Sequence, residues 1–308
     1  MRQYSPLFLR LCILLFMGVL ILFPARGAEG AAAGLLLWYR HVLPVLLPFL
    51  ILCRLMQAFR KDRPGQTLPV ICLGLLCGYP VGAGLAAGLC RSRKDLRPRA
   101  AWLLSFCNQA SPMFLFGYLA AMLPPLSHPV PLIGIGIYGS ALLPGLAGAL
   151  RLRRKTTVTA GPLIRAGHAG GKPSALNPAV SAPFLPILED AMLSSVETLV
   201  KIGVYMMLFS IAACHLTALP FSAPILKALL LSLNEMTTGI AFLAESALPL
   251  RLRCSIQIAS AAFGGFCGFA QTTCVLQGSG LSARRYLAAK ALQGILAFLI
   301  TWTLFPLL

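Results

Sequence analysis

Apolar stretches long enough to cross a membrane alternate with short polar or basic turns along the chain. A transmembrane helix needs about 20 mostly apolar residues, and about seven stretches approach or exceed that length. They comprise residues 7–23, 35–59, 99–123, 132–150, 189–217, 254–281 and 286–308. Two more apolar stretches, 67–90 and 225–248, are interrupted near their centres by glycine, proline or polar residues. The pattern predicts an all-α polytopic membrane protein with about seven transmembrane helices plus two re-entrant helical hairpins.

Composition and charge agree with a membrane protein. The 308 residues are 58% hydrophobic and 11% charged, with a mean hydropathy of +0.82, whereas soluble chains carry about 25% charged residues. The net charge of +18 would suggest nucleic acid in a soluble protein, but here Lys and Arg gather in short turns, as in cytoplasmic loops. We therefore attribute the charge to topology, expect the lipid bilayer and not nucleic acid as partner, and place the N-terminus in the cytoplasm.

The first apolar stretch, residues 7–23, has two interpretations. Arg2 precedes it and Arg10 interrupts it, so it is either a short transmembrane helix or a signal peptide that ends near Gly27 and Ala28. We favour the helix. Under both interpretations the residues that follow lie on the outer side of the membrane.

The stretch 67–90 carries the segment CGYPVGAG at 77–84 and lies between two basic clusters. The clusters comprise Arg60, Lys61 and Arg63 on one side and Arg91, Arg93, Lys94, Arg97 and Arg99 on the other. A single crossing would place them on opposite faces, against the preference of basic loops for the cytoplasm. A re-entrant hairpin that turns at Gly78, Pro80 and Gly82 keeps them on one face, provided that protein or a cavity covers the broken backbone. The alternative is a plain helix kinked at Pro80.

The stretch 99–123 has polar side chains at its centre. Asn108, Gln109 and Ser111 are followed by Pro112, which lacks a backbone N–H and frees carbonyl groups about one turn earlier. A bound ion or solute uses such carbonyls in transporters with discontinuous helices. The alternative is that Asn108 and Ser111 bond to neighbouring helices, at about 0.6 to 2 kcal/mol per contact.

The most polar interruption lies in the stretch 225–248. Its centre carries Asn234, Glu235, Thr237, Thr238 and Gly239 within an otherwise apolar run. A carboxylate in the hydrocarbon region costs about 2.5 to 3.5 kcal/mol and usually faces a cavity or the protein interior. This segment is therefore the first candidate for a functional site.

Basic residues decide how this second interrupted stretch is placed. If it is a hairpin, Arg251 and Arg253 lie on the outer side, against the positive-inside preference. If it crosses fully, Arg284, Arg285 and Lys290 lie outside instead. Two misplaced charges are better than three, so we favour the hairpin.

The two halves of the chain follow the same order of events, namely a spanning helix, an interrupted stretch, a helix broken near Phe-Cys and a closing helix. FCNQA at 106–110 and FCGFAQ at 266–271 hold matching places. With the linker inside, the two hairpins open from opposite sides, which predicts an inverted repeat with a binding site between the halves. The expected divisions are an N-terminal helix or signal peptide with its lead-in at 1–34, two similar halves at 35–150 and 188–308, and a flexible cytoplasmic linker at 151–187.

Other sites find little support in the sequence. The ten cysteines form no CxxC pair and the four histidines have no metal-ligand spacing, so we expect neither a metal nor a cofactor. No catalytic triad or pair of catalytic carboxylates is present, and we expect no enzyme. Glu197 and Lys201 stand four residues apart with the acid first, which favours a structural ion pair on one helix face.

Four separated motifs carry a resemblance to a known family. They are GYPVGA at 78–83, CNQASPMFLFG at 107–117, NEMTTG at 234–239 and FGGFCGFAQ at 263–271 with its downstream YLAAKALQG at 286–294. With these motifs the chain resembles the sporulation integral membrane protein family YlbJ, whose members carry the nucleoside-recognition or Gate domain. The resemblance implies a core like that of concentrative nucleoside transporters and ferrous-iron transporters, a bacterial cell membrane, and a link to spore cortex formation. No GTPase domain or P-loop accompanies it here, which argues against GTPase-linked iron transport.

Two functional hypotheses follow. The first is a carrier that moves a small polar solute, in which Glu235 binds a coupling proton or cation. The second is a non-transporting membrane scaffold for sporulation or envelope assembly, whose basic loops touch anionic lipid; a homo-oligomer remains open under both. The expected substrate-binding residues are Gly78, Tyr79, Pro80, Gly82, Asn108, Gln109, Ser111, Asn234, Glu235, Thr237, Thr238 and Gln271.

Overall fold

The computed structural model describes residues 6–58, 67–126, 129–158, 184–220 and 223–307. Within these ranges all regular structure is helical and no strand occurs. The prediction of an all-α protein is confirmed for this part of the chain.

The N-terminal region is two helices that meet at a sharp bend. Helix α1 (Pro6–Leu22) and helix α2 (Pro24–Leu37) are inclined at 106°. Helix α2 continues through a π-helical turn, η1 (Trp38–Val42), into α3 (Leu43–Ala58). The residues after 23 therefore form a long helix, where the sequence suggested only a short lead-in.

Glycines let α2 approach helix α10 (Phe184–Thr217) closely. A Cβ atom on Gly30 would lie 2.7 Å from the Cα of Ile211, and one on Gly34 would lie 2.8 Å from the Cβ of Ser210. Small residues at a helix crossing are the usual way in which membrane helices pack. The glycines of α2 therefore fix the position of the N-terminal region against the second half.

The first half contains a helical hairpin followed by a broken helix. Its elements are α4 (Leu68–Cys77), α5 (Val81–Ser92), η2 (Lys94–Leu96), α6 (Arg97–Cys107), η3 (Phe114–Leu119), α7 (Ala120–Met122), α8 (Pro129–Gly134), η4 (Ile135–Gly139) and α9 (Ser140–Val158). Helices α4 and α5 pack side by side and form the first hairpin. The chain turns between them at Gly78, with a φ of +76°, and at a cis Tyr79–Pro80 bond. A turn at the predicted glycine and proline is therefore observed.

The second half has the same order of elements. After α10 come α11 (Pro224–Asn234), α12 (Met236–Glu245), α13 (Leu250–Phe263), α14 (Gly265–Leu276), α15 (Ala283–Leu304) and η5 (Phe305–Leu307). Helices α11 and α12 pack together as the second hairpin. Helices α13 and α14 are one helix broken at Gly264. A hairpin and a broken helix thus follow the long helix α10, as they follow α3 in the first half.

Four described helices are long and apolar enough to cross a membrane. They are Pro129–Leu150, Phe184–Thr217, Leu250–Leu276 and Ala283–Leu304, and the bent pair of α1 and α2 makes a fifth if it is counted as one span. The stretch 35–59, expected to be a span, contains a π-helical turn, and the stretch 99–123, expected to be a helix broken near Phe106 and Cys107, is broken after Cys107. The count of about seven therefore stays a prediction.

The expected linker at 151–187 is helical at both of its described ends. Helix α9 continues to Val158 and α10 begins at Phe184. The remaining residues, 159–183, lie outside the described part of the chain.

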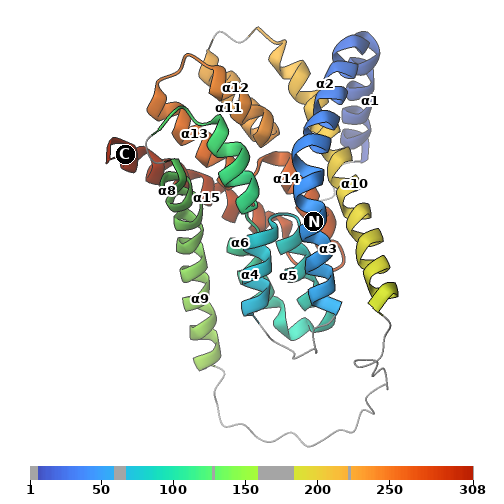
Figure 1. The fold of residues 1–308 in the computed structure, drawn as a ribbon, viewed down its shortest axis with the longest axis vertical. Coiled ribbons are helices and arrows are strands. Elements are labelled where there is room, and N and C mark those ends of the chain that lie inside the picture. Colours follow the sequence, from blue (N-terminus) through green and yellow to red (C-terminus); the bar gives the residue numbers. More distant parts are fainter. Residues whose placement is uncertain (1–5, 59–66, 127–128, 159–183, 221–222, 308) are drawn as a thin grey trace, which may run out of the picture.

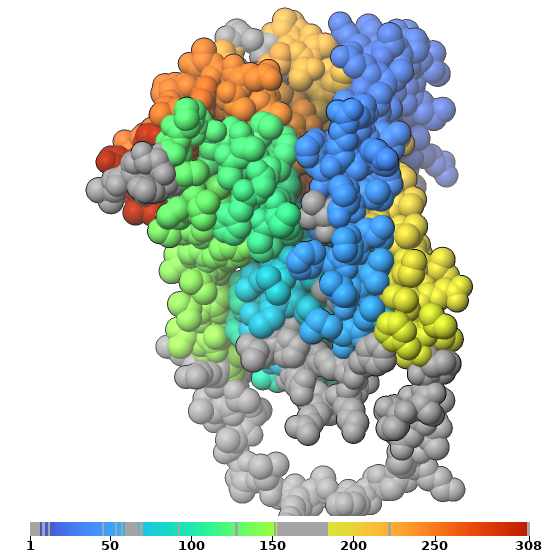
Figure 2. All heavy atoms as spheres, in the orientation of Figure 1, coloured from blue at the N-terminus to red at the C-terminus, as the bar shows by residue number. Residues whose placement is uncertain are grey.

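The two hairpins lie in different parts of the molecule. Figure 1 shows α4 and α5 in the lower half of the view and α11 and α12 in the upper half. One buried cluster connects the halves through Leu119 of η3, Ile133 of α8, Ile240 of α12 and Ile258 of α13. On the face seen in Figure 2, the green surface of the η3–α7 segment lies beside the blue surface of α2 and α3.

Candidate functional site

In the first half, the turn of the hairpin packs directly onto the break of the neighbouring helix. A Cβ atom on Gly78 would lie 2.8 Å from the backbone nitrogen of Ser111, and one on Gly82 would lie 3.1 Å from the Cα of Asn108. The backbone N–H of Tyr79 donates to the carbonyl of Gln109 at 2.8 Å. Gly78 has a left-handed φ, so only glycine suits both its conformation and its surroundings.

In the second half, Glu235 forms the break between α11 and α12. It is extended (φ −148°, ψ 121°) and caps the N-terminus of α12. Its carboxylate accepts bonds from the backbone N–H of Thr237 at 3.0 Å and of Thr238 at 2.8 Å, and from both threonine hydroxyls. Only 3% of Glu235 is exposed. Four donors and the positive end of the helix dipole thus compensate this buried charge.

The break of the second half is completed by two glycines between α13 and α14. Gly264 and Gly265 have φ values of +87° and +67°. A Cβ atom on Gly265 would lie 3.1 Å from the backbone nitrogen of Met236. The α13–α14 break therefore contacts the α11–α12 break, as the corresponding breaks do in the first half.

Tyr79 connects the two halves. Its hydroxyl lies 2.6 Å from the sulfur of Met236, the first residue of α12. Its ring lies over the α13–α14 break, where a Cβ atom on Gly268 would be 3.2 Å from the ring carbon Cε2. The tip of the first hairpin thus reaches the broken helix of the second half.

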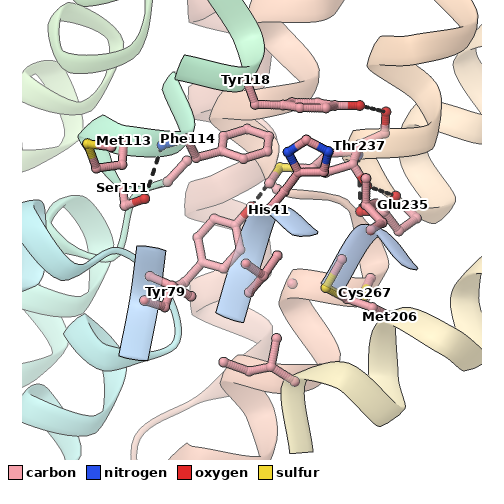
Figure 3. Close-up of a pocket in the computed structure, with 18 of the residues that line it drawn as sticks. His41, Tyr79, Ser111, Met113, Phe114, Tyr118, Met206, Glu235, Thr237 and Cys267 are labelled. Atoms are coloured by element: carbon pink, nitrogen blue, oxygen red, sulfur yellow. Dashed lines mark hydrogen bonds between the residues drawn. The ribbon is translucent and has the colours of Figure 1, made fainter. Parts of the chain in front are cut away.

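A cavity of about 350 Å³ lies where these breaks meet. Figure 3 shows that Tyr79, Tyr118, Glu235 and Cys267 surround it. Its wall includes an aromatic group in which Phe114 stacks on Tyr118 with ring centres 5.2 Å apart, and His41 meets Tyr118 edge-on at 5.8 Å. Arg40 and His41, which are exposed, also line it. The cavity is therefore mostly apolar and aromatic, with a carboxylate in its wall and a basic residue where it is exposed.

Two polar groups in the cavity have sulfur atoms as their hydrogen-bond partners. The amide nitrogen of Gln271 lies 3.3 Å from the Sγ of Cys267, and the hydroxyl of Tyr79 bonds the thioether of Met236. Sulfur is a weak hydrogen-bond acceptor. Gln271, which is 6% exposed, and Tyr79 would therefore gain by exchanging sulfur for an oxygen or nitrogen atom of a bound molecule.

The structure brings five of the expected site residues together around the cavity. Tyr79, Ser111, Glu235, Thr237 and Gln271 line it. The Ser111 oxygen accepts from the backbone N–H of Phe114 at 3.3 Å, which leaves its own proton free to point into the cavity.

The other expected residues shape the breaks or face elsewhere. Gly78 and Pro80 lie in the hairpin turn, whereas Gly82, also expected there, lies in the first turn of α5. Thr238 bonds Glu235, and the Asn234 amide donates to the carbonyl of Phe209 at 2.9 Å. Asn108 and Gln109 are buried on the far side of the α6 break, away from the cavity lining. The Asn108 amide donates to the hydroxyls of Tyr286, at 2.8 Å, and of Thr272, at 3.2 Å.

Sequence reasoning missed several residues of this region. His41, Phe114 and Tyr118 lie in apolar stretches, where an aromatic side chain gives no signal of its own. Lys290 was counted with Arg284 and Arg285 among the charges at the start of the last helix, yet it is 2% exposed and bonds Gln109. The available signal was the position of Lys290 well inside an apolar helix, three residues before Gln293.

The charges outside the cavity have mainly structural partners. Arg251 donates from Nε to the carbonyl of Trp302 at 2.8 Å, and Arg253 donates to the carbonyl of Ser246 at 2.8 Å. Both satisfy carbonyls at helix ends, which gives each of these two residues a local structural role. The predicted pair of Glu197 and Lys201 is present at 2.5 Å, with both side chains 66% exposed.

No group of three or more His, Cys, Asp or Glu side chains is arranged to hold a metal ion in the described ranges. Glu235, the carboxylate of the cavity, is occupied by its four donors. The polar groups that the cavity offers to a solute are therefore hydroxyls and an amide, with Arg40 and His41 where the cavity is exposed.

Comparisons with known proteins give one informative match. The chain is 28% identical to the sporulation integral membrane protein YlbJ of Bacillus subtilis strain 168, in an alignment of 318 positions that covers 89% of this chain and 76% of that protein. No family model matches the chain, and no solved structure is similar to it. The relative is an integral membrane protein by its name, in agreement with the apolar helices of this structure.

Proposed function

The chain belongs to the YlbJ family of multi-pass membrane proteins, and from this premise we propose that it is a carrier whose solute site is the cavity between the two hairpin tips. The observation that carries the proposal is the pairing of Gln271 and Tyr79 with sulfur atoms inside a mostly apolar cavity. Underpaired hydrogen-bonding groups in a largely preformed pocket are typical of small-molecule sites.

The arrangement of the helices supports transport over simple binding. Each half contributes a hairpin and a broken helix, and Tyr79 of the first half contacts the breaks of the second. In carriers built from inverted repeats, solute sites lie between discontinuous helices, and one half moves against the other. We propose the same relationship here, with the two hairpins as mobile elements that open toward opposite sides.

The residues that line the cavity indicate which class of solute it could bind. Phe114 and Tyr118 offer a stacked aromatic wall, whereas Gln271 offers both a donor and an acceptor. A small polar solute with one flat apolar face and one edge of hydrogen-bonding atoms fits this combination. Glu235 holds α12 in place and contributes negative charge to the wall, so we no longer assign it a free coupling cation.

The relative's name suggests the biological setting. YlbJ of Bacillus subtilis is named for sporulation, and we propose that this chain also acts in the cell membrane during sporulation, in formation of the spore cortex.

Uptake into proteoliposomes tests the proposal. The purified protein is screened with nucleosides, small cortex precursors and divalent metals, alongside Gln271→Leu as the cavity variant. The carrier predicts saturable uptake of one class of solute that Gln271→Leu reduces at least about tenfold, because leucine removes both a donor and an acceptor and each hydrogen bond lost by a buried polar group costs about 1 to 3 kcal/mol. Absence of uptake with a folded protein, together with loss of sporulation on reversing loop charges, would favour the membrane scaffold instead.

A further inference from the structure

Lys290 is a buried basic residue beside the break after α6. It lies in the interior of α15, with 2% of its surface exposed. Its Nζ donates to Oε1 of Gln109 at 2.9 Å and to Oε1 of Gln293 at 2.9 Å, and it lies 3.4 Å from the backbone carbonyl of Asn108. Three oxygens thus surround the ammonium group at the α6 break.

The oxygens are held in place by bonds of their own. The two glutamine amides bond each other reciprocally, at 3.1 and 2.8 Å. Gln109 also donates to the carbonyl of Phe106 and Gln293 to the carbonyl of Ile137. Each amide therefore keeps its oxygen directed at Nζ, and the cage does not depend on flexible side chains alone.

No carboxylate neutralises this charge within the described ranges. The ion pairs found there are Arg93 with Asp95 and Glu197 with Lys201, both exposed. A buried ammonium without a counter-ion is costly, so the surrounding dipoles must supply the compensation. Cages of neutral oxygens, including a carbonyl freed at a helix break, are how broken-helix carriers coordinate Na⁺.

We propose that the Lys290 ammonium is a built-in cation that replaces an exchangeable coupling ion at the α6 break. The role as a replacement for a coupling ion rests on the proposed carrier function, whereas binding of a cation by these three oxygens does not depend on transport. The intact protein then has no place for Na⁺ at this break, and its activity is independent of Na⁺. Removal of the lysine side chain exposes a site for a free monovalent cation, above all an alkylammonium ion.

Chemical rescue tests this directly. Lys290→Ala removes a propylammonium fragment, so the variant is purified in detergent and its thermal unfolding is followed with n-propylammonium chloride, NaCl or choline chloride, and with 1-propanol as the uncharged analogue. We expect propylammonium to raise the melting temperature saturably, by about 3 °C or more at ten times its dissociation constant. Propylammonium should not change the melting temperature of the wild type or of Lys201→Ala, a control variant that loses an exposed lysine.

The result that would overturn the proposal is a folded Lys290→Ala protein on which propylammonium and Na⁺ act no differently from choline. If Lys290→Ala does not fold in any of the salts, the melting temperature of Lys290→Met tests the proposal, because methionine fills nearly the same space without a charge. The proposal predicts a melting temperature below that of the wild type for Lys290→Met. A methionine variant as stable as the wild type would show that the cage needs no cation. Unfolding is measured without any solute, so failure here is distinct from failure of solute uptake.

Discussion

The hydroxyl of Tyr79 lies 2.6 Å from the sulfur of Met236, and this contact connects the turn of the first hairpin to the first residue of α12. Two segments 157 positions apart in the chain meet where both backbones are broken. A tyrosine here lies on the wall of the cavity and between the two halves, so it can take part both in solute binding and in the closure of one half on the other.

Tyr79→Phe separates these roles. Because sulfur is a weak acceptor, loss of the hydroxyl should change the free energy of unfolding by less than about 1 kcal/mol. Affinity for the transported solute should fall about five- to tenfold if the hydroxyl bonds it. Tyr39→Phe, at a residue 64% exposed, is the matched control and should alter neither quantity. Binding and thermal unfolding of the same preparations measure both.

Gly268→Ala tests the close packing of the Tyr79 ring on the second half. The added methyl group would lie 3.2 Å from the ring carbon Cε2, so the ring must move, and we expect a loss of about 1 to 3 kcal/mol of stability. Gly88→Ala is the comparison, because it lies in helix α5 with open space around the new Cβ. It should be neutral or stabilising by up to about 1 kcal/mol. Equal melting temperatures for the two variants would contradict the packing described here.

Glu235→Gln tests the capping of α12. The amide keeps an acceptor but loses the negative charge, and we expect a loss of about 1 kcal/mol or more of stability. Glu245→Gln, at the other end of the same helix, should be neutral or slightly stabilising, since a negative charge near a helix C-terminus is unfavourable. Chemical unfolding of both variants in one detergent provides the comparison. The cap assignment fails if Glu235→Gln is as stable as the wild type.

Arg251→Ala tests the anchoring of α15. The guanidinium lies 4.1 Å from the centre of the Trp302 ring and bonds the Trp302 carbonyl, so its removal should cost about 1 to 3 kcal/mol. Arg284→Ala, at an exposed position of the same helix, should stay within about 0.5 kcal/mol of the wild type. Similar losses for both variants would indicate a general effect of charge on the fold and not this contact.

The sequence predicted the breaks because they are caused by local chemistry. Gly78 and Pro80, only two residues apart, favour a break in a helix, and Glu235 marks a position that cannot face lipid. It did not predict that Asn108 and Gln109 turn away from Ser111, because the face to which a side chain points at a break depends on neighbours far along the chain. Here those neighbours are residues of α14 and α15.

Lys290 shows a second limit. Its place within an apolar helix indicated that it could be buried, but only the packing of α6 against α15 shows which oxygens surround it. In assigning the topology, we counted it together with Arg284 and Arg285, which are exposed. Because Lys290 is buried, only Arg284 and Arg285 argue against a full crossing by the stretch 225–248. The assignment of this stretch as a hairpin therefore depends more on the observed break at Glu235 than on the distribution of charge.

The most direct test of the central claim is equilibrium binding of the transported solute to the wild type and to Gln271→Leu. Gln271 bonds only the weakly accepting thiol of Cys267 in the described structure, so leucine should leave the melting temperature of the free protein unchanged or raise it. We predict that the affinity for the solute falls at least about tenfold. Equal affinities for two folded proteins would contradict the cavity as the solute site.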